Sequence, residues 1–225
     1  MKRIIFILLL SQNVFCQSDE INKLLSEGEK AFLSNDFMSA REIYTKATKL
    51  DSLNKNALYN LAATELNLGN NNMACEHFYK LYQLNDGEAL KDIKKYCTNF
   101  RNGTIMFIDD ADEKPKFVFE EKQYPLFDGK NISSKYREIL IREIKKSKIL
   151  KGKVTGKAFV QIHIDKTGVF DGKVIRIGAD EKDIELAKME LLNIFRNIVI
   201  YIPAKHKGIN IELFDKWTLP IDFGD

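Results

Sequence analysis

Long apolar runs are missing from this chain of 225 residues, and cysteine and tryptophan are scarce. The apolar run Ile4 to Leu10 falls well short of the roughly 20 residues that a membrane-spanning helix needs. With 44% apolar and 30% charged residues, the composition excludes a disordered or fibrous protein. It predicts one or two globular domains instead.

The N-terminus has the layout of an export signal. Residues 1–3 carry positive charge, Ile4 to Leu10 are apolar, and Val14 and Cys16 suit positions −3 and −1 of a cleavage site. We therefore interpret residues 1–16 as a signal peptide and expect an exported, periplasmic protein.

A lipoprotein signal is the alternative for the same segment. In that case Cys16 would be lipidated and the protein would be anchored to a membrane. Phe15 and Asn13 stand where such a signal has a small residue and a leucine, which disfavours this interpretation.

Neither sign of charge dominates. The formal net charge of +3 becomes +1 if Lys2 and Arg3 leave with the signal. Nucleic-acid binding depends on many contacts between basic side chains and phosphates, so we expect no nucleic-acid partner. The basic run between Lys145 and Lys157 is interpreted as a solvated helix end and loop, with an anion-binding surface as the alternative.

Residue types that commonly serve in catalysis or metal binding do not occur in recognisable groups. His77, His163 and His206 are scattered, and no Cys, Asp or Glu stands near any of them at metal-ligand spacing. The chain has no nucleophile elbow and no phosphate-binding loop. We predict that the protein is not an enzyme and needs neither cofactor nor metal, and we expect a solvated His163 on the polar face of a strand.

The clearest feature present is an internal repeat. Ile21 to Asn54 and Lys55 to Asp86 repeat with a period of 34 residues. The matched positions are Gly28, Ala40, Tyr44 and Ala47 in the first unit and Ala62, Ala74, Phe78 and Leu81 in the second. This pattern resembles tetratricopeptide repeats, although Ser52 and Asp86 replace the proline often found at the repeat end. The resemblance implies two helical hairpins.

Residues 87–97 have apolar side chains at helical spacing and predict a helix that caps the repeats, so the repeat domain spans residues 19–97. The resemblance also implies a concave surface formed by the first helix of each hairpin. Its positions are Asn22, Leu25, Glu29, Phe32, Asn56, Tyr59, Ala63 and Leu66. Phe32 and Tyr59 are the predicted peptide anchors. Packing of Phe32 and Leu66 under a neighbouring element is the alternative.

Two cysteines remain if the signal is cleaved, Cys75 and Cys97. Cys75 falls near the start of a predicted repeat helix and Cys97 ends the predicted cap. Disulfides persist in exported proteins, so we predict a bridge that fastens the cap to the last repeat. A buried pair of free thiols is the alternative.

An acidic segment, residues 98–124, follows the repeats and is interpreted as a connector. Its acidic cluster, Asp109 to Glu113, lacks the glycine and distal glutamate of an EF-hand. The β-prone runs Ile105–Ile108 and Phe117–Phe119 flank the cluster. They pair either with each other or with the following sheet, and the sequence leaves both arrangements open.

Residues 125–225 combine strand and helix patterns. Apolar residues alternate from Ala158 to Ile164 and from Ile209 to Phe223, and a strand through Val174 to Ile177 carries a bulge expected at Gly172. Helical stripes follow caps near Ser133 and Asp180. They consist of Tyr136, Leu140, Ile141 and Ile144, and then of Ile184, Ala187, Leu191, Ile194, Phe195 and Ile198. Two helices on a three-stranded antiparallel sheet, an α+β domain, are the predicted result.

Several short motifs occur in a fixed order across this region. They are Pro125-x-Phe127-x-Gly129, Gly156-Lys157, Ile164-Asp165-x-x-Gly168, Tyr201-x-Pro203 and Leu219-Pro220-Ile221-x-Phe223. Together they resemble the TonB C-terminal domain, with Tyr201 where that family usually has tryptophan. The expected fold class is thus α+β, with all-α tetratricopeptide hairpins followed by a TonB C-terminal-like domain.

The TonB family's C-terminal domain adds an extended segment of an outer-membrane receptor to its sheet as a strand. The resemblance implies that the docking edge is the strand formed by Ile209, Asn210, Ile211, Glu212 and Leu213. Pairing of two such edges in a homodimer is the alternative.

The sequence thus predicts a non-enzymatic adaptor of the bacterial cell envelope that binds protein or peptide partners. A TonB-dependent outer-membrane receptor is one such partner. The alternative is an energy transducer for these receptors. That role is disfavoured because the family's transducers use an N-terminal transmembrane helix and a long proline-rich spacer, and this chain has a short apolar run and four prolines.

Overall fold

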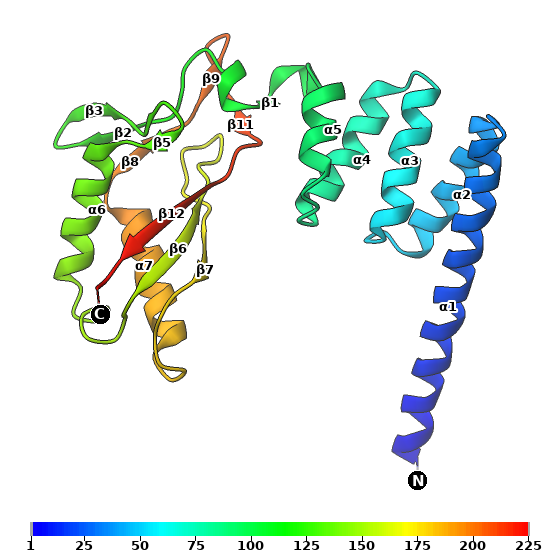
Figure 1. Ribbon diagram of the computed structural model, residues 1–225, viewed down its shortest axis with the longest axis horizontal. Coiled ribbons are helices and arrows are strands. Elements are labelled where there is room, and N and C mark those ends of the chain that lie inside the picture. Colours follow the sequence, from blue (N-terminus) through cyan, green and yellow to red (C-terminus); the bar gives the residue numbers. More distant parts are fainter. Residues whose placement is uncertain (1, 225) are drawn as a thin grey trace. The chain divides into compact units, whose positions relative to one another are not determined.

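The computed structural model describes the backbone of residues 2–224 and the side chains of residues 18–224. The fold is mixed α+β, as predicted at the level of class, and divides into two compact units, Met1–Phe100 and Arg101–Asp225 (Figure 1). Within the described residues, no helix combines the length and apolar character needed to cross a bilayer. The side chains of the predicted signal peptide lie outside the described part.

Unit 1 is entirely helical. Its helices are α1 (Lys2–Leu33), α2 (Phe37–Leu50), α3 (Lys55–Asn67), α4 (Asn71–Gln83) and α5 (Ala89–Tyr96). The side chain of Asp36 accepts a hydrogen bond from Ser39 N, and that of Asn54 accepts one from Ala57 N, so α2 and α3 both begin at a polar cap. Asn35 and Gly69 take positive φ of 61° and 76° in the two hairpin turns, 34 residues apart.

The repeated small and aromatic residues form the core of unit 1. Ala40, Tyr44, Ala74 and Phe78 are all buried. A Cβ added at Gly28 would lie 2.5 Å from the Tyr44 ring, so α1 can approach α2 this closely only with glycine at that position. Two successive helical hairpins therefore pack through equivalent positions.

A disulfide joins the last two helices of unit 1. Cys75 on α4 and Cys97 at the end of α5 have their sulfur atoms 2.03 Å apart, and both residues are buried. The bond fastens α5 to the second hairpin across a sequence separation of 22 residues.

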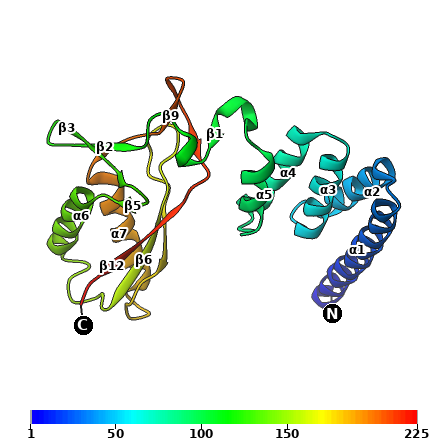
Figure 2. The ribbon, with the colours of Figure 1, turned by 45° about the horizontal axis from the view of Figure 1, so that its top comes forward.

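Unit 2 contains strands and two long helices. Its elements are β1 (Ile105–Met106), β2 (Lys116–Phe119), β3 (Lys122–Pro125), β4 (Phe127–Asp128), β5 (Asn131–Ile132), α6 (Ser134–Lys146), β6 (Lys157–Ile162), β7 (Lys173–Arg176), α7 (Ile184–Asn197), β8 (Ile200–Ile202), β9 (Lys205–His206), β10 (Ile209–Asn210), β11 (Glu212–Leu213) and β12 (Trp217–Asp222). A three-stranded antiparallel sheet has the order β12-β6-β7, and α6 and α7 lie on one side of it (Figure 2).

The predicted alternation in β6 and β12 is confirmed. Val160 and Ile162 on β6 and Leu219 and Ile221 on β12 are buried, whereas Thr218 and its outward neighbours on β12 are exposed. The inward side chains pack against the buried faces of the two helices in one hydrophobic core. Ser133 accepts a hydrogen bond from Tyr136 N and caps α6, as expected.

Residues 101–124 are not a separate connector, because they lie within unit 2. The two β-prone runs do not pair with each other: β1 pairs in parallel with β11, and β2 pairs with both β3 and β8. Phe117 on β2 is fully buried and its ring contacts Tyr124 and Tyr136 with centroid distances of 5.5 and 5.4 Å. The segment therefore supplies part of the core.

The prediction of one strand from Ile209 to Phe223 is wrong. The chain breaks into β10, β11 and β12, and Ile209 is 63% exposed. The break between β11 and β12 contains Asp215, whose carboxylate accepts a hydrogen bond from Ile108 N at 2.7 Å. This bond holds Ile108, just after β1, beside Asp215. The strand before Asp215, β11, pairs with β1, whereas the strand after it, β12, pairs with β6.

Three smaller expectations also fail. Helix α7 begins after Asp183, three residues later than expected. Ile141 is 46% exposed instead of belonging to the buried stripe of α6. The sheet irregularity lies between Phe159 and Val160 and not at Gly172; a Cβ at Gly172 would lie 2.6 Å from the Gln161 carbonyl oxygen, so this glycine allows a close backbone approach.

Tyr201 occupies the position at which the resemblance expects tryptophan, and it anchors a buried hydrogen-bond chain. Its hydroxyl donates to the Phe195 carbonyl at 2.6 Å. The Tyr136 hydroxyl lies 2.6 Å from that of Tyr201 and must donate to it, because the single Tyr201 proton is already used. Burial raises the pKa of both phenols, so both remain protonated.

Candidate functional site

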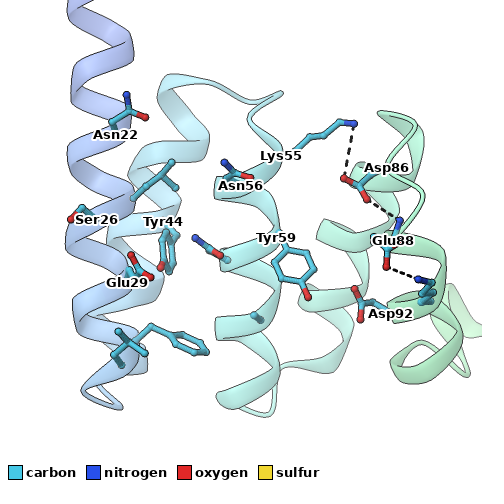
Figure 3. A pocket seen from close by; sticks show the side chains of 16 residues that line it. Asn22, Ser26, Glu29, Tyr44, Lys55, Asn56, Tyr59, Asp86, Glu88 and Asp92 are labelled. Atoms are coloured by element: carbon cyan, nitrogen blue, oxygen red, sulfur yellow. Dashed lines mark hydrogen bonds and ion pairs between the residues drawn. The ribbon is translucent and has the colours of Figure 1, made fainter.

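A groove of about 920 Å³ opens on unit 1, lined mainly by side chains from α1, α3 and the α5 region (Figure 3). Seven of the eight positions expected on the concave surface line it; Leu66 does not. Both predicted anchors, Phe32 and Tyr59, are among the lining residues. The groove exists because the first helices of the two hairpins lie side by side, with α5 beyond α3 (Figure 3).

The two aromatic residues differ in how available they are. The Tyr59 side chain is 46% exposed, and its ring rests edge-on against Phe78 at a centroid distance of 6.1 Å. Phe32 is half-buried, and its ring contacts Phe37 at 5.3 Å. Phe32 therefore packs against its own hairpin in part, and Tyr59 is the main aromatic contact surface for a ligand.

Amide side chains line the groove between the helices. Asn22 on α1 and Asn56 on α3 occupy equivalent positions 34 residues apart, and Asn60 follows one turn later on α3. Among the described residues, none of these three side-chain amides makes a hydrogen bond. Because an amide offers both a donor and an acceptor, such groups can pair with the backbone of an extended peptide.

The groove carries an excess of negative charge. Its two lysines are already paired, Lys55 with Asp86 at 4.0 Å and Lys91 with Glu88 at 2.7 Å. The remaining carboxylates, Glu29 on α1 and Asp92 on α5, form no ion pair within the part of the chain that the structure describes. The groove thus has two more carboxylates than lysines, and Lys95 and Lys91 act on Asp92 only at longer range than an ion pair.

Two pKa shifts reflect this electrostatic environment. Partial burial raises the pKa of Asp92 above its ordinary value of 3.8. The Asp92 carboxylate, followed by burial, raises the pKa of Tyr59 above 10.0. The Tyr59 hydroxyl therefore remains neutral beside a carboxylate that is partly removed from water.

The predicted docking residues of unit 2 are divided between two short strands, each paired on one edge. Glu212 and Leu213 pair with β1, Ile211 is buried, and Ile209 and Asn210 pair with β9. Parallel pairing with β1 occupies one edge of β11, and antiparallel pairing with β9 occupies one edge of β10. Each of β10 and β11 belongs to a two-stranded sheet, so these five residues do not form the single continuous docking strand that was expected, and their role in docking stays a prediction.

The outer edge of β12 is an open edge of the three-stranded sheet. Phe223 N donates to the Gly156 carbonyl at 2.8 Å, so odd-numbered residues bond to β6 and even-numbered ones face outward. Thr218 and Asp222 offer N–H groups there, but Pro220 has none. An added strand would meet one missing donor on β12.

His163 is buried and paired, which corrects the expectation of a solvated side chain. Its Nε2 lies 2.9 Å from Glu212 Oε1 and 3.2 Å from the Leu213 carbonyl, and its Nδ1 lies 3.8 Å from Asp171. Burial by itself lowers the pKa of His163, but Glu212, the Leu213 carbonyl and Asp171 outweigh it and raise the pKa above 6.5. The histidine thus links the end of β6 to β11.

The raised pKa predicts a pH dependence of stability. A folded-state value above the unfolded one means that the contribution of His163 is complete below about pH 6.5 and is lost as the pH rises through the folded value. We expect His163→Gln to destabilise unit 2 more at about pH 5 than at about pH 9. Urea unfolding followed by fluorescence of Trp217, the only tryptophan, measures this.

His77 supplies the control for that experiment. It lies in unit 1, where burial lowers its pKa, so His77→Gln should leave the Trp217 transition unchanged at both pH values. An equal loss of stability for His163→Gln at both ends of the pH range would contradict the predicted ion pair with Glu212.

Sequence reasoning missed the acidic wall of the groove. Asp86, Glu88 and Asp92 lie in or next to the capping helix, which was interpreted only as a closing element. The four-residue spacing of Glu88 and Asp92 places both on one helix face, which is the signal that could have drawn attention to them.

Within the described residues, no group of three or more His, Cys, Asp or Glu side chains is placed to hold a metal ion. Neither a protein-family model nor a curated protein matches the sequence. The functional argument therefore rests on the geometry of the groove and on the residues that line it.

Proposed function

We propose that the protein is a non-enzymatic adaptor that binds extended peptide segments of partner proteins in the groove of unit 1. The observation that carries this proposal is the combination of a half-exposed Tyr59 with the amides of Asn22 and Asn56, which form no hydrogen bond within the described residues, along one groove of about 920 Å³. The amides would pair with peptide backbone, and the tyrosine ring would cover an apolar side chain.

The proposal extends to the cellular location of the protein and to the role of unit 2. The signal-like N-terminus supports export to the periplasm, and the motifs from Pro125 to Phe223 support a TonB C-terminal-like role for unit 2. A receptor segment would then add to the β12 edge, with one hydrogen bond fewer because of Pro220. An exported adaptor of the cell envelope that contacts an outer-membrane receptor fits both features.

Direct energy transduction for such receptors is the second candidate, favoured by the motif that ends at Phe223. It requires an anchored N-terminus, whereas an adaptor acts after cleavage. The groove of unit 1 has the same proposed role in either case.

Selection of peptides by the purified protein tests the groove. A displayed library of random peptides is selected on the protein, and the affinities of the enriched sequences are measured by calorimetry. We expect Tyr59→Ala to cost about 2 kcal/mol, or roughly 30-fold in Kd, because it removes the exposed aromatic anchor.

Met38→Ala is the matched control, since Met38 is 53% exposed on α2 and does not line the groove. Its affinity should equal that of the unaltered protein. Selected peptides that bind Tyr59→Ala as tightly as the original protein would rule out the groove as the binding surface.

A further inference from the structure

The chemistry of the groove also bears on which peptides it selects. Four carboxylates and two lysines line it, and both lysines are already paired with carboxylates of the α5 region. The tetratricopeptide-like groove is therefore negative, and an acidic ligand would meet repulsion on entering it. A ligand that supplies a cation would complete the charge balance.

We propose that the groove selects peptides that carry a lysine or arginine, and that this side chain binds between the Asp92 carboxylate and the ring of Tyr59. This inference rests on the proposed peptide-binding function. The cation would pair with Asp92 and lie against the electron-rich ring face of Tyr59.

The positions of the two residues support this arrangement. Tyr59 projects from α3 and Asp92 from α5, and the hydroxyl end of Tyr59 points toward Asp92 across the groove (Figure 3). Asp92 is partly buried and forms no ion pair in the described chain; Lys95 and Lys91 act on it from a longer range, but the effect of burial on its pKa is larger than theirs. A ligand cation would remove that cost.

The rest of the groove suits a peptide more than an isolated amine. The amide of Asn56 on α3 lies between the α1 wall and the α5 wall (Figure 3). Asn60, one turn later on α3, also lines the groove, so the two amides offer partners for several backbone groups. Glu29 stands on the α1 side, so an extended chain that crosses from α5 to α1 would meet a second carboxylate. A single extended peptide could contact the asparagine amides and both carboxylates at the same time.

Charge-matched variants test the selectivity. Asp92→Asn and Glu88→Gln each remove one negative charge, but only Asp92 lacks a partner, because Glu88 pairs with Lys91. Enriched library peptides should contain lysine or arginine more often than the starting library. Asp92→Asn should weaken binding of such a peptide about tenfold, and Glu88→Gln much less.

A second peptide completes a double-mutant cycle. Replacing the basic residue of the selected peptide with methionine should weaken binding to the original protein and have little further effect on Asp92→Asn. The tenfold difference should also shrink at high salt, because screening weakens the new ion pair.

The outcomes separate the two proposals. Peptides that bind through Tyr59 without enrichment of basic residues, or that ignore Asp92→Asn, would overturn the selectivity and leave peptide binding intact. Failure to select any peptide would overturn both. Self-association that Asp92→Asn abolishes, with no peptide selected, would assign the groove to the basic segment of a second copy and also refute the inference.

Discussion

Phe117→Ala is expected to destabilise unit 2 by about 3–5 kcal/mol, a large part of the stability of a domain of this size. Phe117 is fully buried on β2, where its ring packs against Tyr124 and Tyr136. The variant leaves a cavity beside the Tyr136–Tyr201 hydrogen bond, and the surrounding strands can close it only in part.

Trp217 reports on this transition selectively. It is the only tryptophan, and its ring lies 4.0 Å from that of Phe127, within unit 2. Denaturant unfolding of Phe117→Ala, followed by tryptophan fluorescence, should show a midpoint shifted strongly to lower denaturant. The helical signal of unit 1 in circular dichroism should keep its own midpoint.

Phe119 on the same strand provides the matched control. It is half-buried, and the Arg142 guanidinium lies 5.2 Å from its ring centroid. Phe119→Ala should cost less, about 1 kcal/mol, because Phe119 packs at the margin of the core and is only partly buried. An unchanged Trp217 midpoint for Phe117→Ala would mean that residues 101–124 are a connector after all and contribute nothing to the core.

The contrast between β12 and the segment before it shows where sequence patterns are sufficient. Leu219 and Ile221 alternate with exposed residues because β12 pairs along its length with a single partner, β6. Ile209, Ile211 and Leu213 have the same alternation, but Ile209 pairs with β9, Leu213 pairs with β1, and Ile211 N between them donates to the Ala204 carbonyl. Local periodicity carries no information about a change of pairing partner.

Long-range polar contacts account for two other failures. The hydrogen bond from Ile108 N to Asp215 joins residues 107 positions apart. In the sequence, Asp215 looks like a single polar interruption of one strand, but in the structure it binds a distant segment where one strand ends and the next begins. His163 follows a strand on its polar parity, yet Glu212 and the Leu213 carbonyl hold it in the interior. A polar residue of this kind can be predicted as buried only when its partners are known.

The groove, too, could be predicted from the sequence only in part. Its α1 and α3 positions follow from the repeat of 34 residues, because equivalent positions of successive hairpins lie side by side. Its charge does not follow from composition, since unit 1 has nearly balanced acids and bases. The negative sign arises because four carboxylates and only two lysines line the groove, and the lysines pair with Asp86 and Glu88.

Removing the disulfide is expected to destabilise unit 1 by about 3 kcal/mol, given the sequence separation of 22 residues between Cys75 and Cys97. In the chain-entropy account, the bond limits the unfolded conformations of the segment that contains α5, and this limit disappears in Cys75→Ala/Cys97→Ala. Both cysteines are buried, and alanine avoids placing a hydroxyl there.

Circular dichroism follows the helices of both units, and the Trp217 transition identifies the part that belongs to unit 2, so the remaining helical transition measures the effect on unit 1. Reductant should lower the midpoint of unit 1 in the original protein by the same amount, add two hydrogens to its intact mass, and leave the double variant unchanged.

The acidic wall of the groove adds a functional consequence. Because Asp86, Glu88 and Asp92 are held by α5, reduction should also weaken peptide binding, whereas a protein with free thiols would respond to reductant in neither assay.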